Sequence, residues 1–233
     1  MNVGGRFSAA VARSMARSSA RARAGRPARW STALLAALLL AAGPLRAADE
    51  ADPHAHHHHM APATTRSLAD YKVPAVQLVR DDGKSVRLGD ELDDGRPVVL
   101  SFIYTSCTTI CPVTSLTLAQ LQARLGAARD RVHLVSISID PEQDTPARLH
   151  DYARRFGAGP EWQHYTGTVA ASQASQQAFG VYHGNKMDHA PVTLLRAAPG
   201  ARWVRIDGFA TADQLVAELR DALGGELTAS AGR

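Results

Sequence analysis

The two cysteines of the chain, Cys107 and Cys111, lie four residues apart, where an apolar stretch gives way to a helical pattern. This spacing brings both side chains to one side of the first helical turn. Free N–H groups and the helix dipole at a helix N-terminus stabilise negative charge, which lowers the pKa of a thiol. Two neighbouring thiolates repel each other, and a soft cation relieves that repulsion. Thiolates prefer Cu(I), with zinc as the competitor.

The best candidate for a third donor is His189, in the segment 186–191 (KMDHAP) that precedes a predicted strand. Two sulfurs and one imidazole can hold copper in either oxidation state. Asp188 is a candidate for orienting the imidazole, and Met187 is more simply interpreted as core or loop filler than as a further soft ligand. A lone histidine is usually structural, which is our interpretation of four others: His133, His150, His164 and His183.

Three other interpretations of the cysteine pair remain open. An inert pair or a plain disulfide is one, although a disulfide that closes so short a loop adds little stability. A metal-free dithiol/disulfide oxidoreductase is another, with Cys107 and Cys111 as its redox-active pair. Thioredoxin-type enzymes use C-x-x-C, which is absent here. A peroxidase of related fold needs a lone attacking cysteine and a nearby arginine, and the loop has neither.

The hydrophobic pattern predicts the elements that position these residues. Strands are expected at 76–79, 86–88, 98–104, 132–139, 164–166, 192–195 and 203–206, and helices after Pro112, at 146–156, at 169–179 and at 212–223. This order predicts an α/β domain with a central mixed sheet flanked by helices and an N-terminal β-hairpin, an arrangement that resembles a thioredoxin-like fold. Function is then expected at the carboxyl ends of the strands, where Cys107 lies. Pro191 fits the position at which such sheets often carry a cis-proline.

The net charge of +4 is misleading because residues 1–47 carry eight arginines and no acidic residue. The remainder of the chain is therefore acidic, which gives no support for nucleic-acid binding. An apolar stretch of about a dozen residues, from 32 to 43, is short for a membrane span. We interpret residues 1–47 as an export signal peptide, either cleaved or kept as an N-terminal anchor, and expect a periplasmic protein.

Residues 48–70 are expected to form a disordered, histidine-rich linker. It contains the run from His54 to Met60, whose imidazole and thioether groups are copper or zinc ligands, so we expect a weak auxiliary metal-capture tract. The folded domain is predicted at 71–225, with residues 226–233 as a disordered tail.

Three segments together resemble the Sco/SenC family of copper chaperones: YTSCTTICP at 104–112, SIDPEQDTP at 138–146 and MDHAPVTLL at 187–195. The resemblance covers roughly residues 71–223. It implies a thioredoxin fold and a copper site made by the two cysteines of C-x-x-x-C and a distal histidine, which correspond to Cys107, Cys111 and His189. Asp140 matches an aspartate of the family pattern, and we interpret it as structural or as a support to the ligands.

The resemblance also implies a function. The family assists assembly of the dinuclear copper centre of cytochrome c oxidase, either by delivering copper or by reducing the cysteines of that centre. The expected partner is therefore the copper-centre subunit of a respiratory oxidase, or another copper client. This chain departs from the family pattern at Thr108, Thr109, Ala190 and Pro191. These departures leave the implied ligands intact and leave the partner and the redox potential open.

Overall fold

A computed structural model describes residues 64–222 of the 233-residue chain. The export signal predicted at 1–47, the run from His54 to Met60 and the predicted tail at 226–233 lie outside the described residues. None of the helices within residues 64–222 is long and apolar enough to cross a membrane.

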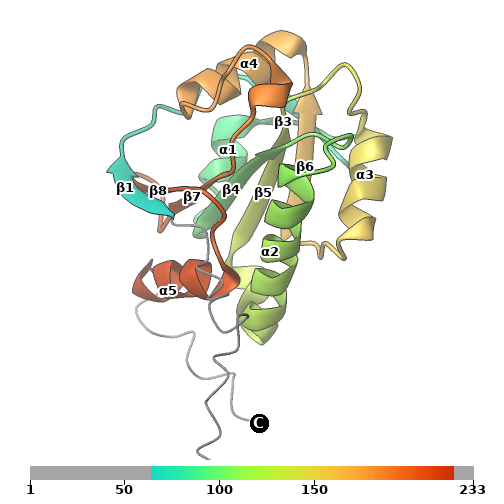
Figure 1. The fold of residues 1–233 in the computed structure, drawn as a ribbon. Helices are drawn as coiled ribbons and strands as arrows, with labels where there is room; N and C mark the ends of the chain where they lie inside the picture. The colour runs from blue at the N-terminus through green and yellow to red at the C-terminus, as the bar shows by residue number, and fades with distance from the viewer. Residues whose placement is uncertain (1–63, 223–233) are drawn as a thin grey trace, which may run out of the picture. The chain divides into compact units, whose positions relative to one another are not determined.

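The described residues form one mixed sheet with helices on both faces (Figure 1). The strands are β1 (Thr65–Ala69), β2 (Gln77–Arg80), β3 (Ser85–Arg87), β4 (Val98–Ile103), β5 (His133–Ser138), β6 (Trp162–Gly167), β7 (Val192–Arg196) and β8 (Trp203–Asp207). The helices are α1 (Leu88–Leu92), α2 (Ile110–Leu125), α3 (Pro146–Arg155), α4 (Val169–Ala178) and α5 (Ala212–Ala222), with short 3-10 turns η1 (Gly126–Arg131) and η2 (Lys186–Asp188). The predicted mixed sheet flanked by helices is confirmed.

The strand order is β1-β8-β7-β4-β5-β6-β2-β3. The three strands β4, β5 and β6 are parallel, and β7 pairs antiparallel with β4. Strand β4 is buried along its whole length, as its apolar sequence predicts for a central strand. The predicted N-terminal hairpin is β2 and β3, joined through a turn with Gly83 at φ 85°.

The linker prediction for residues 48–70 is wrong at its C-terminal end, because residues 65–69 form β1. This strand pairs antiparallel with β8 along its full length, with Thr65 opposite Asp207. Arg66 also binds Glu218 of α5, with Nε 2.5 Å from Oε1. Four of the five β1 side chains are exposed. An edge strand of this kind buries no apolar face, so it leaves no alternating hydrophobic pattern in the sequence.

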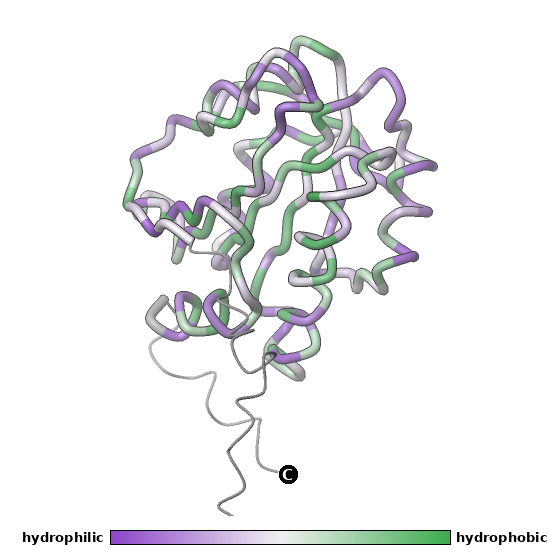
Figure 2. The backbone as a smooth tube through the Cα atoms, in the orientation of Figure 1, coloured by the Kyte–Doolittle hydropathy of each residue, from purple (hydrophilic) through white to green (hydrophobic). Residues whose placement is uncertain are grey.

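Two apolar cores lie on opposite faces of the sheet. One contains Leu100 of β4 and Phe179 after α4, and the other contains Val99 of β4 with Leu118 of α2 and Leu215 of α5. Neighbouring β4 residues therefore point to opposite faces, as the two-residue period of a strand requires. Hydrophobic residues are concentrated along the central strands in Figure 2.

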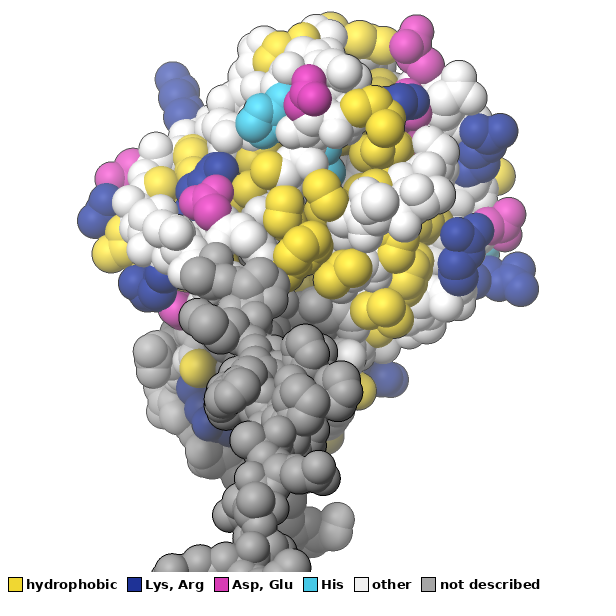
Figure 3. Space-filling view, viewed as in Figure 1, with side chains coloured by type: hydrophobic (Ala, Val, Ile, Leu, Met, Phe, Trp, Pro, Cys, Tyr) yellow, Lys and Arg dark blue, Asp and Glu magenta, His cyan; other side chains and the backbone are white. Residues whose placement is uncertain are grey.

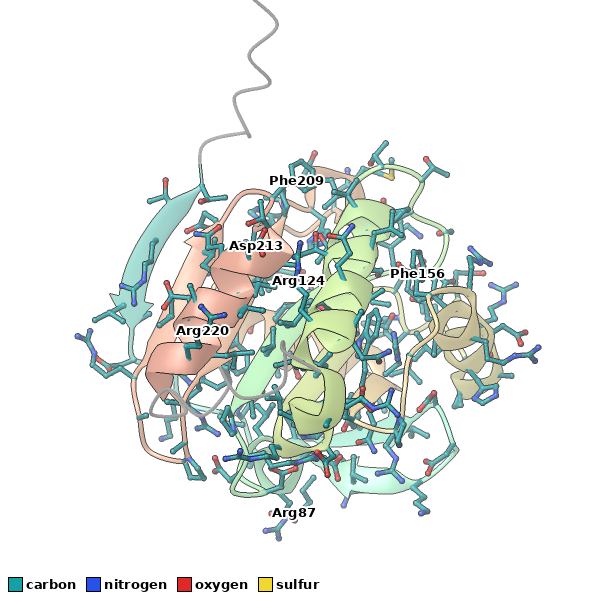
Figure 4. The ribbon with its side chains drawn as sticks, turned by 90° about the horizontal axis from the view of Figure 1, so that it is seen from below. Arg87, Arg124, Phe156, Phe209, Asp213 and Arg220 are labelled. Carbon is teal, nitrogen blue, oxygen red and sulfur yellow. The ribbon has the colours of Figure 1, made fainter. Side chains whose placement is uncertain are left out.

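Helices α5, α2 and α3 lie in a row on one face of the sheet (Figure 4). Arg124 of α2 and Asp213 of α5 lie 3.4 Å apart between the first two helices. The start of α3 follows its sequence: Thr145 accepts a hydrogen bond from the Arg148 N–H, and Pro146 is the first helical residue. Helix α2, whose N-terminus carries the cysteines, is held on this face by its buried residues Leu118, Leu121 and Leu125.

Candidate metal centre

The cysteines lie in the connection from β4 to α2. The Cys107 N–H donates to the Tyr104 carbonyl at 3.1 Å, which closes a turn directly after the strand. Cys111 is the second residue of α2, and its N–H donates to the Cys107 sulfur at 3.3 Å. Both cysteines are free thiols and both are buried. The predicted clustering of the two sulfurs at a helix start is therefore present as a reduced pair.

The two thiols differ in acidity. Burial by itself raises the pKa of Cys107, but the N–H groups of Cys111 and Thr109, the Cys111 thiol and the Tyr104 hydroxyl lower it to about 7. Burial raises the pKa of Cys111 well above its usual range, and the neighbouring Cys107 raises it further. The predicted lowering of thiol pKa at the helix N-terminus is therefore found for Cys107. The prediction is wrong for Cys111, because burial raises the pKa of that thiol by more than the helix start lowers it.

Asp144 positions this loop, and the sequence did not single it out. Its fully buried carboxylate accepts hydrogen bonds from the Thr105 N–H at 3.2 Å, the Thr105 hydroxyl at 2.6 Å and the Ser138 hydroxyl at 2.6 Å. These contacts tie the residues before Cys107 to the end of β5. The sequence signal for this residue is the segment SIDPEQDTP, in which three acidic residues occur at every second position. Sequence alone does not say which of the three is buried.

His189 reaches this region through the pairing of β4 with β7. The strands are antiparallel with Ser101 opposite Thr193, so the segment before β7 runs beside the segment after β4. The imidazole is buried, and its Nδ1 has no hydrogen-bond partner. Burial lowers its pKa, the Phe102 carbonyl raises it, and His183 lowers it. A buried neutral ring with an unpartnered nitrogen is suited to bind a metal ion.

The three predicted ligands are not gathered into a closed site. Within residues 64–222, no three histidine, cysteine, aspartate or glutamate side chains lie close enough together to hold a metal ion. The structure brings Cys107 and Cys111 together and places His189 in the adjacent segment. Joining the imidazole to the sulfurs therefore requires movement of that segment.

The predicted roles of two aspartates come out differently. Asp188 is exposed in η2, and since the His189 Nδ1 has no partner, Asp188 does not orient the imidazole through that nitrogen. Asp140 has a structural role: its Oδ2 lies 2.5 Å from Lys186 Nζ and so ties η2 to the end of β5. Pro191 is not a cis-proline, because every peptide bond in residues 64–222 is trans.

Met187 lies in the exposed turn η2 and not in the core, so of the two expected roles only that of a loop residue is compatible with the structure. It is 70% exposed, and its Sδ accepts a hydrogen bond from the Tyr104 hydroxyl at 3.7 Å. Two further exposed apolar residues, Val113 and Leu116, lie on α2 shortly after Cys111. Figure 3 shows a band of hydrophobic side chains over the region of α2 on this face. The cysteine pair is therefore bordered by apolar surface.

A pocket of about 380 Å³ opens beside His189 and includes Asp140, His183 and Lys186 in its lining. Of the four histidines interpreted as structural, His183 is thus near His189, and none of the four lies in the cysteine loop. His133 is buried in a hydrogen-bond network with Glu91 and Gln163. His164 is buried between aromatic rings, with its centroid 5.1 Å from Trp162 and 6.0 Å from Tyr152. His150 and His183 are exposed.

The donor set fits a soft metal ion. One thiol ionises near pH 7, a second thiol adjoins it, and a neutral imidazole with a free nitrogen lies in the next segment. Thiolate and imidazole ligands suit copper and zinc, whereas hard cations prefer oxygen. Asp144 is a carboxylate in contact with the loop, and its oxygens are already occupied by hydroxyl and N–H donors.

Comparison with known proteins identifies relatives over this same region. The sequence model of the SCO1/SenC family matches residues 65–224. A SCO1 protein homolog of Bacillus subtilis (strain 168) is 34% identical over 99 residues, which is 42% of this chain and 50% of the homolog. The chain thus spans about half the length of the curated relatives it matches.

Solved structures agree over a longer stretch. The structure of Arabidopsis thaliana ScoI with copper bound is 27% identical, with a TM-score of 0.55, and the match covers 65% of this chain and 98% of that one. Bradyrhizobium japonicum ScoI with copper bound is 26% identical, with a TM-score of 0.54, covering 63% of this chain and 96% of that one.

Proposed function

The chain belongs to the SCO1/SenC family, and from that premise we propose that it binds copper through Cys107, Cys111 and His189 and transfers it to a client protein. One observation carries the proposal: two adjacent free thiols, one of them with a pKa of about 7, lie beside a segment that bears a buried, unpartnered imidazole. The two ScoI structures with copper bound support the choice of metal.

Copper is the cargo of this protein, so the ligands must both hold and release it. Cys107 and Cys111 provide a thiolate pair for Cu(I), and His189 completes the site for Cu(II). Release proceeds by ligand exchange, in which an acceptor cysteine or histidine displaces one donor at a time. A Cys107–Cys111 disulfide binds copper poorly, so the reduced pair is a prerequisite.

The client that we propose is the copper-centre subunit of a respiratory oxidase. The exposed apolar residues Val113 and Leu116, which follow the cysteines on α2, support this proposal because exposed apolar surface favours contact with a partner protein. We further propose that transfer takes place outside the cytoplasm, with residues 1–47 directing export. The oxidising conditions there make maintenance of the reduced pair part of the function.

The test is copper binding by the reduced full chain and by the variants C107S, C111S and H189A. We expect near one copper per wild-type chain by elemental analysis, and loss of tight Cu(I) binding in either cysteine variant. In H189A we expect weaker Cu(II) binding and an altered electron paramagnetic resonance spectrum. H150A removes an exposed histidine outside the site and should bind as wild type. Wild-type affinity in C107S would overturn the ligand assignment.

A second function is favoured by the difference in acidity between the two thiols. In a thiol–disulfide reductase, the Cys107 thiolate attacks a client disulfide and forms a mixed disulfide, releasing one client thiolate. Cys111 then attacks Cys107, releasing the second client thiolate and leaving a Cys107–Cys111 disulfide. The client gains two electrons and this chain loses them. If the H189A variant still reduces a client disulfide stoichiometrically, the result supports this function over metal transfer.

A further inference from the structure

We propose that the Met187 thioether is a third sulfur donor for Cu(I), and that the oxidation state of copper selects between Met187 and His189. This inference rests on the proposed function, because it concerns the same copper site. Met187 is an additional ligand, which the pattern of cysteines and histidine does not include.

The Tyr104 side chain links two separate segments that carry sulfur atoms. Its hydroxyl donates to the Met187 Sδ at 3.7 Å, and its side chain belongs to the buried cluster that contains Cys107 and Cys111. A phenol has one proton and donates to one sulfur at a time. Met187 and the cysteine pair therefore both lie close to the Tyr104 side chain.

Met187 is free to move toward a metal ion at the cysteines. Its side chain is 70% exposed, so no packing has to be broken when it changes conformation. A methionine side chain has three rotatable bonds and adapts readily to a new partner. His189, in contrast, is buried, and its imidazole faces the Phe102 carbonyl. The thioether can therefore approach the cysteine pair with less rearrangement than the imidazole.

Lys186 holds the segment in the orientation that this approach requires. Its Nζ lies 2.5 Å from Asp140 Oδ2 and 5.6 Å from the centroid of the Tyr104 ring. These two contacts anchor η2 over Tyr104, directly beside Met187.

The chemistry of the donors assigns them to different oxidation states. A thioether is soft and uncharged, so it favours Cu(I) and adds no repulsion to a site that already holds two thiolates. An imidazole also suits Cu(II). Because Met187 and His189 are two residues apart in one segment, oxidation of copper can exchange one donor for the other through movement of that segment alone.

X-ray absorption at the copper edge tests the proposal on the reduced full chain loaded with one equivalent of Cu(I). We expect three sulfur scatterers for wild type and two for M187L, which conserves volume at an exposed position. We also expect the Cu(I) affinity of M187L, measured by competition with a chromophoric chelator, to fall about tenfold. The Cu(II) resonance spectrum should stay unchanged.

The copper reduction potential gives a second readout. Weaker Cu(I) binding with unchanged Cu(II) binding lowers the potential, by about 59 mV for a tenfold loss. L68A is the control, because it alters an exposed apolar residue of β1, away from the cysteine loop, and should leave all these values at wild type. Equal sulfur counts and affinities for M187L and wild type would overturn the proposal, as would the same loss in L68A.

The result separates this inference from the function on which it rests. If wild type binds Cu(I) with two sulfurs and M187L does the same, only the role of Met187 is wrong. If wild type binds no Cu(I), both fail. Selenomethionine-labelled protein provides a direct check: a copper scatterer in the selenium absorption spectrum that disappears in M187L supports the proposal, and its absence from wild type contradicts it.

Discussion

The Cys111 backbone N–H donates a hydrogen bond to the Cys107 sulfur at 3.3 Å. This contact stabilises the Cys107 thiolate, while burial keeps the Cys111 thiol protonated. The two cysteines therefore have different chemical roles in the metal-free protein. We therefore expect Cys107 to act as the nucleophile and to bind a metal ion first, and Cys111 to lose its proton only when a metal ion or a disulfide takes the place of that proton.

Alkylation kinetics should distinguish the two thiols. In the reduced, metal-free protein we expect iodoacetamide to modify Cys107 first, with a rate that rises as pH increases through about 7. The rate rises with pH because only the thiolate reacts. Peptide mass mapping after brief labelling identifies the modified residue. C107S should react far more slowly than C111S, and equal labelling of both cysteines in wild type would contradict the assignment.

Replacement of Asp144 by asparagine should destabilise the cysteine loop. The amide group would direct its own N–H groups toward hydroxyl and N–H donors that now bind the carboxylate. We expect a loss of about 2–3 kcal/mol in the free energy of unfolding, measured with urea. S138A removes one of these donors and should cost about 1 kcal/mol. A D144N protein as stable as wild type would mean that the contacts do not hold the loop.

The ion pair between Lys186 and Asp140 should slow the approach of His189 to the cysteines. K186Q and D140N each remove this contact between η2 and the end of β5. We expect both variants to bind Cu(II) several-fold faster in stopped-flow measurements, since the segment carrying His189 is then less restrained. D151N, which alters an exposed residue of α3, is the control. Unchanged rates in both variants would show that this contact does not limit closure of the site.

His164 should make the stability of the fold depend on pH. Burial lowers its pKa from 6.5 to about 3, and neither ring nitrogen has a hydrogen-bond partner. The unfolded chain therefore binds a proton that the folded chain excludes, so this contribution is complete above pH 6.5 and is lost progressively as pH falls toward 3. The loss at pH 5 is about 2 kcal/mol.

H164F should remove this contribution without leaving a cavity. We expect the difference in unfolding free energy between pH 7 and pH 5 to be about 2 kcal/mol smaller in H164F than in wild type. H150F changes an exposed histidine and should retain the wild-type dependence. The prediction fails if H164F and wild type lose the same free energy over this range.

Local sequence signals predicted most of the fold. The apolar run of β4, the Thr145 cap before Pro146 and the Asp-Gly turn between β2 and β3 each act over a few residues, so they can be recognised without a structure. Strand β1 has no such signal, because its stability comes from pairing with β8, more than 130 residues away in the chain.

The site was predicted in part, for the same reason. The spacing of Cys107 and Cys111 at the start of a predicted helix identified them as a pair. The place of His189 directly before a predicted strand identified it as a neighbour of that pair. The sequence did not reveal which of these side chains are buried. Burial raises the pKa of Cys111 and selects Asp144 over Asp140 as the residue that holds the loop. Asp188, in contrast, is exposed. Each depends on which residues distant in sequence cover the side chain.

The antiparallel ladder between β4 and β7 also sets how many residues can separate His189 from the sheet. With Ser101 opposite Thr193, inserting or deleting one residue between His189 and Val192 shifts the imidazole by one strand position, about 3.3 Å, and turns it to the other face. Insertions or deletions before Asn185 do not change the number of residues between His189 and Val192. We therefore expect the loop at 181–185 to accept insertions, and the three-residue interval from His189 to Val192 to tolerate none.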